Sequence, residues 1–450
     1  MIFLKKFPLK YKVYILLVIV FVAMSYAYRF KLVQEAKIMD EKDLTKGKYV
    51  VSVWLKTSPE AEARINMIEK YNEENKDNIY IAFRMENDDY FNLLRTALAS
   101  TDKPDIFQYG YYELYRYESL MDMEQFGLDI DKIGKENLLY YEKKPMGVKI
   151  LGNNVKFVWN KEMLKGAGID PESQPKTFDE VLDYAIKIKK AYPNVTPFEF
   201  PAYTYGELKT SIGEMSVNKG SIYTTFWDYK NGKYNFDYSK DILNIYNKMY
   251  SLGLLDKDFM NNNRLDLRRD FSEQKTAMII STFEDKNYFD NIMPLKFSIG
   301  ISELPKIDIK DSQNYYFTEN STALVVNKNV DNADKNKEAI KKVFDLFLDK
   351  EINNQLLASK KALPIFMENA IQKQDIYKEY NNKTNFKNEL FDASISINYD
   401  QGVTKQLFYD AINGNQKVDD VIKKLNKNFE GYTKTMVDNY SLDVNKFMEK

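Results

Sequence analysis

The feature that most constrains this chain is an alternation of strand-like and helix-like segments. Residues 48–55, KYVVSVWL, are rich in β-branched and aromatic residues, as buried strands are. Ser58 and Pro59 then supply an N-cap and a proline at the first helical position. Further strands are expected at 79–85 and 105–107, with helices between them. Alternation of this kind predicts βαβ units, a parallel sheet and the α/β class.

The pattern continues through the rest of the chain. Residues 89–99 predict a helix whose buried side carries Leu93, Leu94, Ala97 and Leu98. A capping box opens a second helix at Thr177, and the last third is mostly helical, ending in an amphipathic helix over 418–432. The remaining strands are expected at 156–159, 275–281, 297–301 and 321–326.

Two absences and a charge balance exclude several classes of function. The chain has no Cys and no His, which removes thiolate and Ser-His-Asp catalysis and Cys-ligated zinc. Neither a GxxxxGK[ST] phosphate loop nor a complete dinucleotide fingerprint is present. Basic and acidic residues number 65 and 66, so the clustered charge that nucleic acid requires is not expected. Any catalysis would have to rest on carboxylates, Lys, Tyr or a hard cation, which disfavours most enzymes. We expect a protein that is not an enzyme, with no catalytic residues, no cofactor and no metal.

The N-terminus predicts an exported chain. Sixteen uncharged, mostly apolar residues at 13–28 follow four lysines, the last of which is Lys12. The segment fits a cleaved signal peptide or an uncleaved membrane anchor, and the sequence leaves both open. The positive charge before it places the rest of the chain outside the cytoplasm, on the extracellular face of the membrane. Residues 32–47 are polar and predict a tether.

An aromatic cluster follows the third predicted strand. Residues 108–117, QYGYYELYRY, contain five tyrosines. The charge balance argues against base stacking, which leaves core packing or the wall of a ligand site. Because ligands bind at the carboxyl ends of strands in α/β sheets, the position favours a ligand site for the first of these residues.

Several segments, in order, resemble one family. They are KPDIFQYG, VWNKEMLKGAGID…PKTFDEVLDYA, NGKYNFD…NKMYSLGLLDKDF, EQKTAMIIST, STALVVNKN and ALPIFMENA. Together they are similar to the extracellular solute-binding proteins of ABC importers, in the sugar-binding group that includes maltose-binding protein. The likeness spans roughly residues 48–435, and the missing lipidated cysteine and the absence of His are departures from it.

The resemblance implies a two-lobed periplasmic-binding-protein-like fold of type II, with a hinge between discontinuous lobes. Residues 1–45 form the signal or anchor and tether. Lobe one is expected at 46–152 plus 320–370, and lobe two at 153–319 plus 371–450. The implied function is capture of a sugar or oligosaccharide between the lobes and its delivery to the transmembrane subunits of an ABC permease, by a monomer.

A sugar site needs flat aromatic side chains for the C–H faces of the ring and polar side chains for its hydroxyl edge. The resemblance implies such roles for residues at strand ends in both lobes, with local packing as the alternative for the tyrosines. The expected ligand-binding residues are Lys56, Thr57, Tyr109, Tyr112, Glu113, Asn153, Asn154, Tyr203, Tyr205, Phe283 and Glu284.

Two further features have a structural and a functional interpretation. Arg264, Arg268 and Arg269 form a cluster whose default interpretation is salt bridging on a helix face. An acidic ligand, such as a uronic-acid oligosaccharide, would make them contact residues. Trp227 precedes a turn and is predicted to be structural.

Three alternatives to sugar import remain open. One is a ligand of another class, a peptide or a polyamine. Another is a surface-anchored glycoside hydrolase, which would need two carboxylates flanking the scissile bond. The third is a sensor that reports a bound ligand to a signalling receptor.

Overall fold

The computed structural model describes most of the chain from residue 44 onward. The described ranges are 44–86, 90–99, 103–109, 119–134, 137–141, 144–151, 155–213, 226–310, 323–328, 334–359 and 399–448. The predicted signal or anchor segment lies outside them. Within these ranges, no helix has both the length and the apolarity that crossing a membrane requires.

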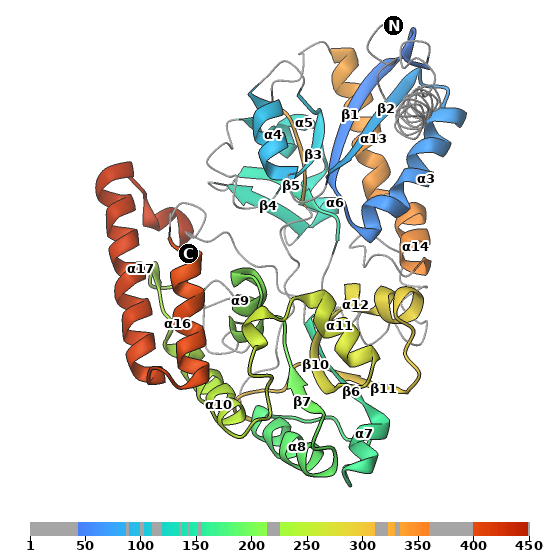
Figure 1. The fold of residues 1–450 in the computed structure, drawn as a ribbon. Helices are drawn as coiled ribbons and strands as arrows, with labels where there is room; N and C mark the ends of the chain where they lie inside the picture. The colour runs from blue at the N-terminus through green and yellow to red at the C-terminus, as the bar shows by residue number, and fades with distance from the viewer. Residues whose placement is uncertain are drawn as a thin grey trace, which may run out of the picture.

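Ten strands form two separate sheets, which lie in different bodies of the molecule (Figure 1). In spatial order the first sheet contains β2 (Ile79–Glu86), β1 (Tyr49–Lys56), β3 (Ile106–Tyr109), β12 (Ala323–Val326), β5 (Lys144–Lys149) and β4 (Leu138–Tyr141). The second sheet contains β11 (Ile299–Ser302), β6 (Val155–Asn160), β10 (Thr276–Thr282) and β7 (Thr196–Glu199). A two-stranded ribbon joins β8 (Trp227–Asp228) to β9 (Lys233–Tyr234).

Helices cover both faces of each sheet. Those beside the first sheet are α3 (Pro59–Glu74), α4 (Tyr90–Leu98), α5 (Met123–Phe126), α6 (Ile130–Ile133), α13 (Asp334–Leu348) and α14 (Lys350–Ala358). Those beside the second are α7 (Lys161–Gly166), α8 (Phe178–Ala191), α9 (Tyr205–Gly213), α10 (Lys240–Ser251), α11 (Arg264–Ser272), α12 (Phe283–Asn287), α16 (Gln401–Asn413) and α17 (Val418–Tyr440).

The prediction of a parallel sheet is only partly correct. Strands β2, β1 and β3 are parallel, as the βαβ pattern requires. However, β12 is antiparallel to both β3 and β5, and β6 is antiparallel to both β10 and β11. Both antiparallel strands follow a passage of the chain from one sheet to the other, so no local βαβ unit sets their direction.

The first sheet is buried on both faces because its side chains alternate. Val51 and Val53 of β1 pack with Phe344 and Phe347 of α13 on one face. On the other face, Trp54 packs with residues of α4. One prediction for α4 was wrong. Leu93 is 37% exposed, since the face of the helix toward the sheet carries Tyr90, Leu94 and Ala97 instead.

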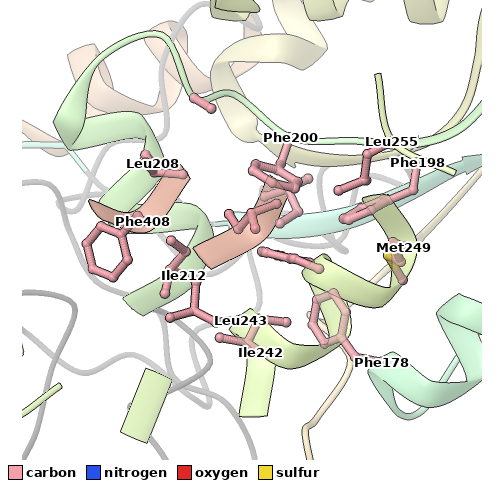
Figure 2. Close-up of a cluster of buried hydrophobic side chains, with 14 of the residues drawn as sticks. Phe178, Phe198, Phe200, Leu208, Ile212, Ile242, Leu243, Met249, Leu255 and Phe408 are labelled. Atoms are coloured by element: carbon pink, nitrogen blue, oxygen red, sulfur yellow. The ribbon is translucent and has the colours of Figure 1, made fainter. Parts of the chain in front are cut away.

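The second sheet has a larger, aromatic core on one face. Figure 2 shows part of it, where α8, β7, α9, α10 and α16 each contribute side chains such as Phe178, Phe198 and Phe408. Phe200 stacks on Tyr246 with ring centroids 4.5 Å apart. Trp227, which was predicted to be structural, is fully buried, and its indole N–H donates to the carbonyl of Phe447 at 2.8 Å. The C-terminal segment therefore belongs to the core of the second sheet.

The predicted N-caps are present. The side chain of Ser58 accepts from Ala61 N at 3.0 Å, and that of Thr177 accepts from Glu180 N at 3.3 Å. The carboxylate of Glu180 accepts from Lys176 N at 2.6 Å rather than from the N–H of the cap residue Thr177, so the capping box is shifted by one position. Helix α17 continues to Tyr440, beyond the predicted end at 432.

Three passages carry the chain between the sheets. The first joins β5 to β6, the second joins β11 to β12, and the third joins α14 to α16. Each sheet is consequently assembled from segments that are distant in the sequence. We keep the predicted lobe boundaries as a proposal, with each passage as a segment at which the lobes exchange.

Candidate functional site

In each sheet, most of the strands run in the same direction and therefore end at the same edge of the sheet. In the first sheet β1, β2, β3 and β5 run the same way, because β12 is antiparallel to both β3 and β5. In the second sheet β7, β10 and β11 run the same way and β6 begins where they end. We call these the first carboxyl edge and the second carboxyl edge. In α/β sheets this is the edge at which ligands bind.

A short connection limits the distance between the two edges. Strand β5 ends at Lys149 and β6 begins at Val155, with only residues 150–154 between them. Six extended residues span at most about 22 Å. At the two strand ends that this connection joins, the carboxyl edges therefore lie within about 22 Å of each other.

The pairing register aligns the strand ends of the first carboxyl edge. Lys56 pairs with Glu86, while Ala323 pairs with both Tyr109 and Lys149. Two side chains stabilise this edge. Gln108 accepts from Lys56 N at 3.0 Å, and the hydroxyl of Tyr90 donates to the carbonyl of Gln108 at 2.7 Å.

The predicted residues of the first edge differ in exposure. Lys56 is half-buried and Thr57 is exposed directly after β1, with its N–H donating to the carbonyl of Glu86 at 2.7 Å. Tyr109 is only 1% exposed, and its ring packs edge-on against Phe107. The structure thus gives Tyr109 a packing role, and its stacking on a ligand stays a prediction. Tyr112, Glu113, Asn153 and Asn154 lie outside the described residues.

The described strand ends of the first carboxyl edge carry several charged side chains. Lys56 and Arg84 are cationic and Glu86 is anionic, while Lys149 at the end of β5 is fully buried. Arg84 pairs with Glu86 and places its guanidinium carbon 4.4 Å from the centroid of the Trp54 ring. Stacking on an indole is favourable for a guanidinium and holds Arg84 in one orientation.

The second carboxyl edge is organised around one buried carboxylate, Asp285, in the first turn of α12. It accepts from Thr282 N at 2.8 Å, from Ser281 Oγ at 2.9 Å and from Arg268 Nε at 2.7 Å. Arg264 Nη1 lies 3.3 Å away. Burial alone would raise the pKa of Asp285, but the two guanidinium groups outweigh it and hold that pKa below its ordinary value.

The three arginines of α11 occupy different environments. Arg268 is buried, paired with Asp285, and has its guanidinium carbon 3.7 Å from the centroid of the Tyr288 ring. Arg269 lies on the exposed side and pairs with Asp266 at 2.8 Å. Arg264 is partly exposed at the edge itself. The default salt-bridge interpretation describes the contacts of all three, and a ligand contact by any of them stays a prediction.

Phe283 and Glu284 directly follow the last residue of β10. Phe283 begins α12, so its backbone lies at the second carboxyl edge. The side chain of Glu284 is 45% exposed, with a carboxylate oxygen 3.5 Å from Arg268 Nη2. Both residues adjoin the Asp285 cluster, where a ligand at this edge would lie.

Tyr203 is the more exposed of the two predicted tyrosines at this edge, with 55% of its surface accessible. It follows β7 in the segment before α9. Tyr205, two residues later, is 6% exposed and packs edge-on against Tyr399 with ring centroids 5.6 Å apart. Of the two tyrosines, only Tyr203 presents its ring to solvent.

One site residue was missed at the sequence level. Lys405 of α16 donates from Nζ to the carbonyl of Tyr203 and, at 3.2 Å, to that of Met260. The same Nζ lies 5.5 Å from the centroid of the Tyr203 ring, and burial lowers the pKa of Lys405. Lysine on a helix face is usually solvated, so only a spatial contact across 202 positions reveals this role.

A buried acid stands at the end of β7. Glu199 is 4% exposed, and its Oε2 atom has no hydrogen-bond partner within the described part of the chain. Burial, followed by the nearby Asp270 and Asp256, raises the pKa of Glu199 to about 8. Its neighbourhood is therefore acidic as well as dry. Across the described ranges, no group of three or more acidic side chains has an arrangement that could hold a metal ion.

Comparisons with known proteins agree on one family. Residues 57–354 match the family described as "Bacterial extracellular solute-binding protein". A "Probable amino-acid ABC transporter periplasmic-binding protein y4oP" of Sinorhizobium fredii is 30% identical over 121 residues, a match that spans 23% of this chain and 26% of that relative. The chain therefore covers about a quarter of the length of this curated relative.

Matches to solved structures of similar fold extend over nearly the whole length of those structures. The sugar-binding protein MalE of Xanthomonas citri is 15% identical, with a TM-score of 0.68 over 88% of this chain and 100% of that one. The ABC substrate-binding protein Lmo0181 of Listeria monocytogenes, solved with cycloalternan, is 17% identical, with a TM-score of 0.66 over 86% and 99% of the two chains. At these identities the likeness shows the fold, which is that of two-lobed, type II periplasmic binding proteins.

Proposed function

Because the chain belongs to the family of bacterial extracellular solute-binding proteins, we propose that it captures a sugar or an oligosaccharide between its two carboxyl edges and delivers it to the permease of an ABC importer. The observation that carries the proposal is that the short segment 150–154 connects the two carboxyl edges. The exposed Tyr203 lies at the second edge, and Lys56 and Thr57 lie at the first. The sugar-bound or sugar-named neighbours of the same fold support this ligand class.

The proposed mechanism is closure of two lobes around the ligand. The three passages between the sheets act as the hinge, and a ligand that contacts both edges favours the closed state over the open state. The closed state then docks on the permease. We place the protein, as a monomer, on the extracellular side of a membrane, held there or exported by residues 1–45.

The test is thermal unfolding of the chain from residue 46 onward with a panel of neutral and acidic oligosaccharides, each recovered afterwards by chromatography. A micromolar ligand at 1 mM should add about 4 kcal/mol to the free energy of unfolding. Recovery of an intact ligand supports a binding protein, and recovery of a cleaved ligand would instead support a glycoside hydrolase.

A matched pair of variants locates the binding site. Tyr203→Ala should weaken saccharide binding by at least tenfold, because aromatic rings supply the apolar surface for a sugar face. Tyr440→Ala is the control, since Tyr440 is 70% exposed at the end of α17, away from the second carboxyl edge. Equal affinities of the two variants would contradict the proposed position of the ligand.

A second candidate ligand class is amino acids and short peptides. It is favoured by one observation, the local likeness to the relative whose name describes an amino-acid transporter. The same unfolding assay with amino acids and dipeptides tests it. Stabilisation by these compounds and by no saccharide would replace the sugar with a peptide ligand and leave the two-lobed capture mechanism in place.

A further inference from the structure

Arg264 differs from the two arginines beside it because it is anchored to Asp285 and is still partly exposed at the second carboxyl edge, whereas Arg268 is buried and Arg269 lies on the exposed side of the helix. Its Nη1 contacts Asp285 at 3.3 Å and Thr282 Oγ1 at 3.5 Å. Within the described ranges, its Nε and Nη2 groups have no protein partner, and 18% of the side chain is exposed. A guanidinium fixed at one nitrogen and open at the others is suited to bidentate binding of a carboxylate.

The position of Arg264 is that of a ligand contact. It begins α11 between the carboxyl ends of β7 and β10, since Asn262 O accepts from Ala202 N at 3.2 Å and Asp285 follows β10 directly. The exposed ring of Tyr203 is the next residue after Ala202, and Lys405 of α16 lies over that ring. The aromatic ring of Tyr203 thus stands beside Lys405, and the segment that carries it is hydrogen-bonded to the segment that leads into Arg264.

One cation at the opposite edge has no acidic partner within the described ranges. Lys56 is half-buried at the end of β1, whereas Arg84 pairs with Glu86. At the second edge, by contrast, Asp285 and Glu284 balance Arg264 and Arg268. A neutral sugar gains nothing from the charge of Lys56, whereas an anionic ligand is attracted by it.

We propose that the ligand is an acidic saccharide, whose ring lies on Tyr203 and whose carboxylate pairs with Arg264. This inference rests on the proposed function and narrows it to one substrate class. Lys405 adds a second positive charge beside the same ring. Arg268 and Arg269 take no part, because the first is committed to Asp285 and the second points to the exposed side of α11.

The experiment compares uronic-acid disaccharides and trisaccharides with the neutral saccharides obtained by reducing each carboxyl group. Isothermal titration measures both affinities in 50 mM and 500 mM NaCl. At least one acid should bind tenfold more tightly than its neutral counterpart, a difference of about 1.4 kcal/mol. The preference should shrink at high salt, because screening weakens the charge pair and leaves ring stacking unchanged.

Two variants test the assignment of the carboxylate contact. Arg264→Gln should lose at least tenfold in affinity for the acid and less than threefold for the neutral saccharide, whereas Arg269→Gln should lose neither. Arg264→Lys keeps the positive charge beside Asp285 and removes only the planar guanidinium that can bind a carboxylate through two nitrogens. This variant should fold normally and still lose part of the preference for the acid.

The outcomes separate this inference from the proposed function. If a neutral saccharide binds as tightly as every acid, or if Arg264→Gln keeps the preference for the acid, the inference is overturned and the sugar-binding function stands. If no saccharide of either kind binds, the proposed function fails together with it.

Discussion

At the scale of single residues, Asp285 connects the end of β10, the start of α12 and two arginines of α11. Its carboxylate is fully buried and every bond that it accepts comes from a donor on these elements. Removing one partner of such a cluster leaves an uncompensated buried charge, which costs more than the pair itself contributes.

Asp285→Asn should lower the free energy of unfolding at pH 7 by about 3 to 5 kcal/mol, measured by urea denaturation. Asp266→Asn is the matched control, because Asp266 pairs with Arg269 on the same helix at the surface, and it should cost less than about 1 kcal/mol. Because the folded-state pKa of Asp285 is lowered, its contribution is present above the unfolded-state pKa and is lost as pH falls through the folded value. Similar costs for the two variants would show that Asp285 is not the centre of the cluster.

The pKa of Glu199 is shifted upward, whereas that of Asp285 is shifted downward, so the two groups have opposite effects on how stability changes with pH. Its pKa is about 8 in the folded state and 4.5 as the ordinary value, so between these pH values the folded chain holds a proton that the unfolded chain has released. The free energy of unfolding therefore falls as pH rises through this window. Glu199→Gln should remove that slope, and its advantage should grow to the order of 2–4 kcal/mol near pH 8.5. Unfolding curves at pH 5, 7 and 8.5 test this, and parallel pH profiles of the two proteins would contradict it.

At the scale of elements, the pairing of β11 with β6 depends on a missing side chain. A Cβ placed on Gly300 would lie 1.9 Å from the ring of Trp159, its pairing partner on β6, which donates to the carbonyl of Pro171. The tryptophan has little room to move, because its indole N–H is already committed at 2.9 Å.

Gly300→Ala should therefore destabilise the protein by about 1 to 3 kcal/mol through overpacking. Gly431→Ala in α17 should do the reverse and stabilise it by about 0.5 to 1 kcal/mol, since a Cβ there meets no atom within 4 Å and alanine favours helix. Thermal unfolding of the two variants, compared with the parent chain, gives both signs in one experiment. A tolerated Gly300→Ala would mean that Trp159 can repack.

Elements were predictable from the sequence where the signal is local. Strand β1, the N-cap Ser58 and the helix after Thr177 each depend on neighbouring residues, and all three form as expected. The sequence did not reveal the direction of β6 and β12, because pairing across distant segments decides it. The role of Lys405 was hidden for the same reason, and Leu93 was misplaced because several faces of a short apolar helix look alike.

At the scale of the whole molecule, the two sheets have separate hydrophobic cores. Phe344 packs in the core of the first sheet and Phe408 in that of the second, and no buried residue belongs to both groups within the described chain. Large-to-small substitutions in such cores cost about 3–5 kcal/mol. Each substitution should therefore act on the stability of one body.

Calorimetry of the ligand-free chain should show two overlapping transitions. Phe344→Ala should lower the temperature of one and Phe408→Ala that of the other, because each core unfolds with its own sheet. A ligand that contacts both carboxyl edges should merge the two into one. A single transition that shifts equally in both variants would show instead that the bodies unfold together without a ligand.

The central position of β12 has a consequence for biosynthesis. Strand β12 lies between β3 and β5, yet 173 residues separate Lys149 from Ala323 in the sequence. At ordinary rates of translation, the other five strands of that sheet wait roughly 10 to 35 s for β12. During this interval β3 and β5 carry unpaired backbone edges of the kind that chaperones cover and aggregates use. The nascent chain is most vulnerable in this interval, long before its C-terminal helices exist.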